Sequence, residues 1–362
     1  MAAKAVVKRM TRTTRPRRFP SGRAPRSLSK PRQYTGVEAA VLIATLAVGL
    51  LVLPSKVEAQ PPTEKVWRIG ALMALYPPEA DPPQAFEQRL HTLGYVAGHN
   101  LVIEWRYAQG RDDRLPRLAA ELVRLNVDLI VADTTLATRA ARQATSTIPI
   151  VMAQSADAVE GGLVSSLAHP GGNVTGNSLM LAETSVKRLQ LLREAVPRIS
   201  RVAVLWDPAA PFHRAMLKEI AAAAPALQVQ PIAVAVKSRN DLGDALAEIT
   251  RSHADALFVS QVMSPTARRQ LLDFAAKSRL PTLFADRRYV VAGGLMSYSP
   301  NRAEMFQQAA IYVDKIFKGV KPGDLPVEQP TTFDLVINTR TAAALGLTIS
   351  PSVLAQASEV IQ

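Results

Sequence analysis

The chain has 362 residues and a net charge of +13, of which residues 1–59 supply +10 and residues 60–362 only +3. The longer part is therefore almost neutral, which argues against a nucleic-acid partner, because such a partner needs a basic patch on the folded domain itself. The absence of cysteine excludes disulfides, Cys-ligated zinc, iron–sulfur clusters, thiol catalysis and the lipid anchor of a bacterial lipoprotein.

The first sixty residues are predicted to direct export. Residues 1–35 hold eleven basic residues, several prolines and no acid, a composition expected to be disordered. The uncharged, largely apolar stretch Ala39–Leu53 follows; its fifteen residues suit the core of a signal peptide better than a spanning helix of about 20 residues. Val57-Glu58-Ala59 then predicts signal-peptide cleavage before Gln60 and a periplasmic location.

The route of export is left open by the sequence. A start codon at Met10 or a twin-arginine signal at Arg17-Arg18-Phe19 would explain the long basic arm, although the usual spacer residue before the Phe is missing. An uncleaved N-terminal anchor is a further alternative. Under each of these readings we expect residues 60–362 to be soluble and to lie outside the cytoplasmic membrane, because no second apolar run approaches 18 residues.

From Trp67 onward, short apolar runs alternate with amphipathic stretches. The first series predicts strands at 67–72, 101–107, 128–132, 149–153 and near Val174, with helices at 84–93, 115–125 and 136–144. A second series begins near 182–185. It predicts strands at 201–207, 229–236, 256–260, 281–285 and 294–299, with helices at 185–196, 212–223, 241–250, 265–277 and 303–318. The second series ends with a Pro-rich link at 321–330, a strand at 333–337 and a helix at 341–345.

Near-continuous apolar strands separated by helices are typical of parallel sheets that are covered on both faces. About ten strands in two runs, each of which begins with a similar phrase (RIGAL at 68 and RVAVL at 201), predict an α/β protein of two doubly wound, Rossmann-like lobes. We place the first lobe boundary near Ala182–Ser185.

Several familiar kinds of chemistry are missing. The loop after the first strand, Met73–Pro78, has no glycine, so a dinucleotide pyrophosphate could not approach its backbone. The phosphate-binding P-loop, G-x-S-x-G and H-E-x-x-H motifs are absent, and the five histidines are scattered. We therefore expect no cofactor, no metal ion and no catalytic residue.

Ligands of parallel α/β sheets bind outside the carboxyl ends of the strands, so the residues there are the candidates. The predicted ligand-binding residues are Tyr76, Thr134, Thr135, Ser155, Asp157, Asp207, Phe212 and Asp286. Strand ends also bring Gln154, Trp206 and Ser260 to this edge.

Each candidate has an ordinary structural alternative. Thr134 and Thr135 precede a helix and could hold a carboxylate, or one could simply be an N-cap. Asp157 and Asp286 could hold an ammonium group, or act as a cap or ion-pair partner. Tyr76, Trp206 and Phe212 could sandwich a flat or apolar ligand, with core packing as the alternative, which is favoured for Trp206 because it ends an apolar strand.

Long phrases closely resemble a family of bacterial ABC-transporter substrate-binding proteins with the type I periplasmic-binding fold. They include LGYVAGHNLVIEWRYAQGRDDRLPRLAAELVRLNVDLIVA (93–132), GLVSSLAHPGGNVTG (162–176), RLQLLREAVPRISRVAVLWDP (188–208) and AAIYVDKIFKGVKPGDLPVEQPTTFDLVINTRTAAALGLTI (309–349). The resemblance covers nearly all of residues 60–362. It does not name a ligand, although some relatives are linked to aromatic amino acids.

Two departures from the family pattern fall at the predicted mouth of the site. Ala156-Asp157-Ala158-Val159 stands where the family usually has Gly-Asp-Pro-Val, and Asp133-Thr134-Thr135 stands where it often has Gly-Gly-Thr. The extra acid would disfavour a ligand carboxylate unless Asp133 points away.

The resemblance implies three crossings between the lobes. On that basis we expect residues 60–183 in lobe 1, 184–297 in lobe 2, 298–331 again in lobe 1 and 332–362 again in lobe 2.

The resemblance also implies a receptor that closes on a small polar or aromatic solute, amino-acid-like solutes included, and delivers it to an ABC permease and its ATPase. Contact with the membrane would then occur only through the permease. The alternatives are a Rossmann-type enzyme that acts on a small molecule and, more remotely, a transcription regulator of the same two-lobe fold.

Overall fold

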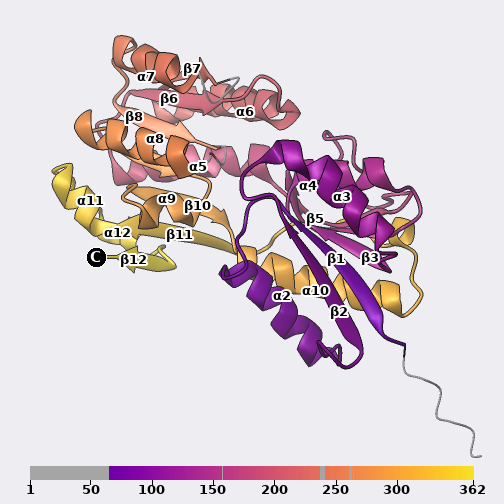
Figure 1. The fold of residues 1–362 in the computed structure, drawn as a ribbon. Coiled ribbons are helices and arrows are strands. Elements are labelled where there is room, and N and C mark those ends of the chain that lie inside the picture. The colour runs from indigo at the N-terminus through magenta and orange to yellow at the C-terminus, as the bar shows by residue number, and fades with distance from the viewer. Residues whose placement is uncertain (1–64, 157, 237–240, 261–262, 264) are drawn as a thin grey trace, which may run out of the picture. The chain divides into compact units, whose positions relative to one another are not determined.

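The computed structural model describes residues 65–156, 158–236, 241–260, 263 and 265–362. The basic arm, the apolar stretch and the predicted cleavage site all lie outside the described residues. Residues 64–362 form one compact unit of alternating strands and helices (Figure 1).

The first sheet has five parallel strands in the order β2-β1-β3-β4-β5. Their bounds are β1 Trp67–Met73, β2 Leu101–Tyr107, β3 Leu129–Ala132, β4 Ile150–Ala156 and β5 Val174–Leu179. Successive side chains alternate between two cores: Leu72 faces the helices on one side, whereas Ala71 and Met73 face those on the other. Both faces of the sheet are therefore buried, as the near-continuous apolar runs predicted.

Helices cover both faces of this sheet, and we call the whole assembly lobe 1. α3 Leu115–Arg124, which follows the 3₁₀ turn η1 Asp112–Arg114, packs beside α4 Thr135–Ala144. On the other face α2 Asp81–Thr92 packs along α10 Arg302–Phe317, although more than 200 residues of chain separate them (Figure 1). Lobe 1 is thus built partly from the C-terminal part of the chain.

The second sheet has seven strands in the order β12-β11-β10-β9-β8-β6-β7. Their bounds are β6 Arg201–Trp206, β7 Gln230–Ala235, β8 Ala256–Val259, β9 Thr282–Phe284, β10 Met296–Pro300, β11 Phe333–Asn338 and β12 Glu359–Ile361. One pair, β10 with β11, is antiparallel, which the apolar runs of the sequence did not predict. Pro300 pairs with Phe333, because the chain leaves the sheet after β10 and re-enters it at the same end.

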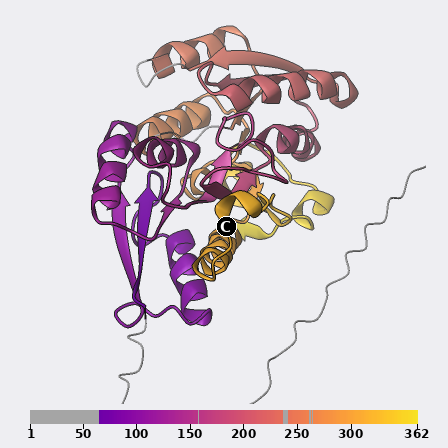
Figure 2. The same ribbon diagram turned by 90° about the vertical axis from the view of Figure 1, so that its right-hand side faces the viewer.

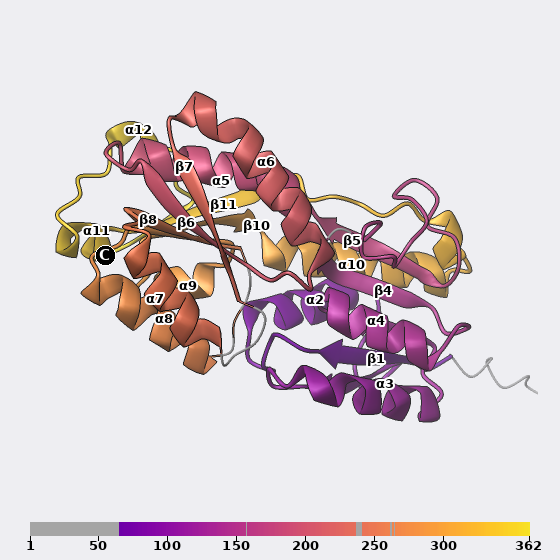
Figure 3. The same cartoon turned by 90° about the horizontal axis from the view of Figure 1, so that it is seen from above.

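The helices of the second sheet complete lobe 2 (Figure 3). Their bounds are α5 Leu181–Ala195, α6 Pro211–Leu227, α7 Leu242–Arg251, α8 Pro265–Lys277, α9 Arg287–Val291, α11 Thr339–Ala344 and α12 Pro351–Leu354. α5 and α6 share one core with the sheet, and α7 and α8 share the other.

The chain crosses between the sheets after β5, after β10 and after the 3₁₀ turn η3 Pro322–Asp324 (Figure 2). β10 runs to Pro300, so the second crossing comes later than the expected boundary at 298. The first falls before α5, earlier than expected, because α5 already packs on α6. The two-lobe α/β architecture is confirmed, and the precise division of the chain between the lobes stays a prediction.

Element bounds differ from expectation mainly at prolines. α2 begins at Asp81 and takes Pro82 and Pro83 into its first turn, where the missing N–H groups would have no helical partner. α6 continues through Pro225 to Leu227 and ends at Gln228 in the left-handed conformation (φ 52°). α9, α12 and β12 were not predicted, because segments of three to five residues are too short to show a periodicity.

Candidate ligand-binding site

A cavity of about 1070 Å³ is lined by the carboxyl-end loops of both sheets. Lobe 1 supplies the loops after β1, β2, β3 and β4, and lobe 2 supplies the loops after β6 and β8 together with the start of α9. This is the position at which parallel α/β sheets bind ligands. The volume lies just above the range of about 300–1,000 Å³ that is usual for small-molecule sites.

Five of the eight predicted residues line this cavity: Tyr76, Thr134, Thr135, Asp207 and Phe212. Ser155 lies behind the wall, buried, with its hydroxyl 3.3 Å from that of Thr138. Asp286 is buried one layer behind the wall, and Asp157 lies outside the described residues. Contact of any of these side chains with a ligand stays a prediction.

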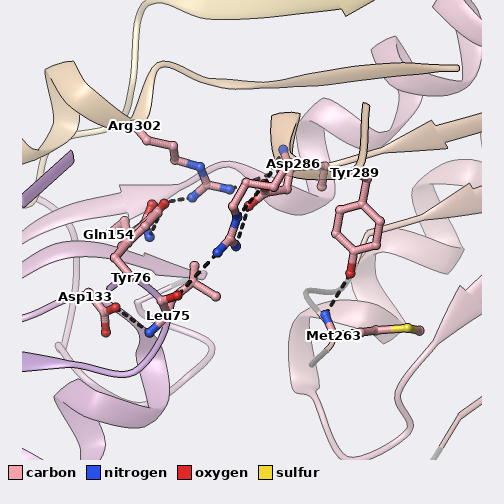
Figure 4. A network of polar contacts seen from close by, with 10 residues as sticks. Leu75, Tyr76, Asp133, Gln154, Met263, Asp286, Tyr289 and Arg302 are labelled. Atoms are coloured by element: carbon pink, nitrogen blue, oxygen red, sulfur yellow. Dashed lines mark hydrogen bonds and ion pairs between the residues drawn. The ribbon is translucent and has the colours of Figure 1, made fainter. Parts of the chain in front are cut away.

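Asp133 is buried, and its carboxylate accepts hydrogen bonds from the loop after β1. The backbone N–H groups of Ala74 and Leu75 donate to its two oxygens, each at 2.8 Å. Burial raises the pKa of Asp133 to about 6, against the lowering effect of these hydrogen bonds. The extra acid of this chain therefore holds the loop after β1 in place (Figure 4).

The two threonines after β3 are also engaged locally. The Thr134 hydroxyl caps α4 by accepting the N–H of Ala137 at 3.2 Å, the ordinary alternative weighed for it. The Thr135 hydroxyl accepts the N–H of Ala156 at 2.8 Å and so fixes the loop that follows β4. Both side chains line the cavity while they organise its wall.

Tyr76 lies at the centre of a polar and aromatic cluster that reaches across the lobes. Its hydroxyl accepts a hydrogen bond from the Gln154 amide at 3.1 Å, and Arg302 in turn donates to the Gln154 oxygen (Figure 4). Arg302 also donates to the carbonyl of Ala285 in lobe 2, at 3.3 Å. Burial raises the pKa of the Tyr76 phenol, so the ring stays neutral. Its edge packs on Phe306, with ring centroids 5.6 Å apart.

Asp286 and Arg288 form a bidentate ion pair at the start of α9, with both contacts at 2.9 Å. Asp286 also caps the helix through the N–H of Arg288, so it fills both ordinary roles weighed for it. The Arg288 guanidinium lies over the Tyr76 ring, 5.2 Å from its centroid. It also donates a hydrogen bond to the carbonyl of Leu75 at 3.3 Å. The pair is therefore a second contact between the lobes.

A buried cation lies at the crossing point of the chain. Arg188 on α5 is fully buried and donates to the carbonyls of Tyr298, at 2.7 Å, and Leu181. Burial, reinforced by repulsion from Arg302, lowers its pKa to about 9. The guanidinium thus ties together two of the segments that connect the lobes.

The lobe 2 wall carries a histidine and a serine in contact. His213 on α6 is buried, with Nδ1 2.9 Å from the backbone N of Asp207 and Nε2 2.9 Å from the Ser260 hydroxyl. The ring of Phe212 lies against it, at 4.2 Å between centroids. Asp207 is half-buried and accepts the N–H of Ala209 at 2.8 Å.

Comparison with known proteins identifies the family of this chain. The model of the family described as ABC transporter substrate binding protein matches residues 82–361. The chain belongs to that family. The predicted family and the predicted role as a solute receptor are therefore confirmed, as is the type I periplasmic-binding fold.

Individual relatives share about a quarter of their residues with this ABC transporter substrate-binding protein. A tyrosine-binding protein of Clostridioides difficile (strain R20291) is 25% identical over 287 residues, which are 79% of this chain and 82% of the relative. The structure of an ABC domain in complex with L-Trp from Streptococcus pneumonia is 26% identical, with a TM-score of 0.74 over 82% of this chain and 99% of the other. A conserved domain protein from Vibrio cholerae is also 26% identical, with the same TM-score, and is covered completely.

Family membership bears on the activity, the partners and the location of the protein. The family consists of substrate-binding proteins rather than enzymes, and it implies a small-molecule ligand and an ABC permease as partners. Substrate-binding proteins of ABC importers work outside the cytoplasm. In the part of the chain that the structure describes, no helix has the length and apolarity to cross a bilayer. Within the same ranges, no three potential metal ligands gather at one point.

Three residues of the site were missed by the reasoning from sequence: His213, Arg288 and Arg302. Each follows a candidate or a strand end by one or two residues, so a wider window around the strand ends would have included them. Their decisive contacts are remote, however. Arg288 reaches Leu75 across 213 positions and Arg302 reaches Gln154 across 148.

Proposed function

We propose that this ABC transporter substrate-binding protein captures an aromatic, amino-acid-like solute between its two lobes and presents it to a permease without altering it. The observation that carries the proposal is the lining of the cavity, to which lobe 1 contributes the rings of Tyr76 and Tyr107 and lobe 2 that of Phe212. Aromatic faces from both sides suit a flat ligand group. The ligands named for two relatives, tyrosine and L-Trp, are of this class.

Closure of the lobes would couple binding to transport. A ligand that touches both walls stabilises the form in which the walls are close together, through its differential affinity for that form. The contacts Arg288–Leu75 and Arg302–Ala285 already join the walls beside Tyr76. We propose that the permease and its ATPase respond to this closed form.

The test is calorimetry and thermal unfolding of the purified protein with L-tyrosine and L-tryptophan. A ligand at 100 times its Kd should add about 2.7 kcal/mol to the free energy of unfolding. Phe212→Ala should weaken binding, whereas Phe333→Ala, which removes a lobe 2 ring that does not line the cavity, should not. Silence across amino acids, sugars, nucleosides and aromatic acids would contradict the proposal.

We further propose that the protein reaches the periplasm through its N-terminal signal, with cleavage before Gln60. N-terminal sequencing of the exported protein should begin at Gln60. An exported chain that retains Ala39–Leu53 would instead support the uncleaved anchor.

A further inference from the structure

The His213 ring has a defined proton position. Its Nδ1 faces the backbone N–H of Asp207 at 2.9 Å, and a backbone N–H can only donate. The carbonyl oxygen of Asp207 also faces Nδ1 but lies farther away, at 3.2 Å. A proton on Nδ1 would point at the nearer N–H hydrogen, so we infer that Nδ1 accepts and carries no proton. A neutral imidazole with an unprotonated Nδ1 carries its proton on Nε2. Burial also lowers the pKa of His213, against the raising effects of the Asp207 carbonyl and charge, and the lowered pKa favours a neutral ring.

This tautomer fixes what the Ser260 hydroxyl can do. The Nε2–H of His213 donates to Ser260 Oγ at 2.9 Å, so one lone pair of the hydroxyl is used. Ser260 is 3% exposed and yet lines the cavity. Among the described residues, no acceptor takes the hydroxyl proton of Ser260. The hydroxyl is therefore left as a donor on the lobe 2 wall.

We propose that Ser260 binds the solute by donating a hydrogen bond to an oxygen acceptor of the ligand, with His213 as the positioning residue that holds the hydroxyl in this role. The inference rests on the proposed function and adds a chemical requirement to it: the solute presents a carboxylate or phenol oxygen to lobe 2. Arg268 lines the same wall, and its charge favours an oxygen that carries negative charge.

The same geometry argues that His213 and Ser260 are not a catalytic dyad. A serine nucleophile needs an unprotonated Nε2 that accepts its proton. Here Nε2 carries the proton, because Nδ1 is occupied by the Asp207 N–H. Ser260 is thus a binding residue and not a nucleophile.

The first experiment reads the tautomer in the protein without added solute. ¹⁵N NMR of the full protein should show the His213 Nε2 as protonated and Nδ1 as unprotonated at neutral pH. The reverse tautomer, or covalent labelling of Ser260 by a fluorophosphonate, would overturn the inference. Neither readout depends on which solute binds, so failure here is distinguishable from failure of the proposed function.

The second experiment measures Ser260→Ala with L-tyrosine, L-phenylalanine and tyramine, which differ in their acceptor oxygens. Affinity should fall about tenfold, the worth of one hydrogen bond. If the acceptor is the carboxylate, tyramine should show no loss, and if it is the phenol oxygen, phenylalanine should show none. Equal losses for all three compounds, or no loss for any, would contradict the inference. Ser352→Ala, an exposed serine of lobe 2, is the matched control.

A double-mutant cycle tests the positioning role of His213. His213→Ala should weaken binding, but combination with Ser260→Ala should add little to the loss from Ser260→Ala alone, because His213 acts on the solute only through the Ser260 hydroxyl. His213→Gln, whose amide can accept and donate at once, should recover part of the affinity. Additive losses would show that His213 acts only as a packing residue.

Discussion

The two walls of the cavity use their polar groups differently. On the lobe 1 wall, Asp133, Thr134 and Thr135 all bond to backbone groups of their own lobe. On the lobe 2 wall, Ser260 receives a hydrogen bond from a side chain and keeps its own proton available. One wall is thus fixed by its hydrogen bonds, whereas the other retains a donor. A polar residue at a strand end can therefore organise the site or bind the solute, and only its partners decide which.

The largest expected effect concerns the support beneath the lobe 1 wall. Phe306 is fully buried on α10 and packs edge-on against Tyr76. Phe306→Ala should lower the free energy of unfolding by about 3–5 kcal/mol, because a large core ring leaves a cavity. Denaturant unfolding with an unchanged m-value would measure it.

Phe212→Ala is the counterpart on the lobe 2 wall. Its ring is half-buried, so we expect a loss of stability of about 1 kcal/mol or less together with the loss of affinity. If both variants lost the same stability, the contrast between the walls would be wrong.

The second prediction concerns Asp133. In Asp133→Asn the amide NH₂ faces one of the two backbone donors that the carboxylate now accepts. An unsatisfied buried N–H costs about 1–3 kcal/mol, and solute affinity should fall as the loop after β1 loosens. Asp207→Asn, at the half-buried acid of lobe 2, should change stability by only about 0.5 kcal/mol.

The deficit of Asp133→Asn should depend on pH. The pKa of Asp133 is raised to about 6 from 3.8, so its contribution to stability is fully present below 3.8 and is lost as pH rises through about 6. The variant lacks this contribution, so its deficit should grow as pH falls from 7 to 4. A deficit that does not change with pH would contradict the buried carboxyl described here.

The smallest expected effect comes from His213, whose pKa is shifted in the opposite direction. Its pKa is lowered from 6.5 by burial, so its contribution is present above 6.5 and is lost as pH falls toward the lowered value. The stability difference between the native protein and His213→Gln should therefore shrink below pH 6.5. Denaturant unfolding between pH 5 and 8 would measure it, and parallel curves would contradict a neutral His213.

Much of the fold was predictable because strands that are buried on both faces of a sheet appear in the sequence as near-continuous apolar runs. The apolar runs at 67–72 and 201–207 correspond to β1 and β6, and the glycine after Phe317 and Lys318 marks the end of α10. The antiparallel pairing of β10 with β11 was not predictable from periodicity, since direction depends on where the chain returns from lobe 1. The short α9 was missed for lack of a full helical repeat.

The site was predictable in position but not in the use of its residues. The strand-end rule brought Tyr76, Thr135 and Asp207 to the cavity. It could not show that the Asp133 carboxylate binds backbone N–H groups, because the sequence does not tell where a side chain points. Nor could it find Arg302, which contacts Gln154 of its own lobe and Ala285 of lobe 2 only once the chain has folded.

The loop after β1 is held through its main chain: Asp133 takes its N–H groups, and Arg288 takes the carbonyl of Leu75. Side chains in this loop can consequently be exchanged over evolutionary time without loss of the loop's conformation. A lineage could alter the half-buried Leu75, which lines the cavity, to accept a different nutrient while it retains the same scaffold and the same transporter. Diversification of uptake would then need very few mutations.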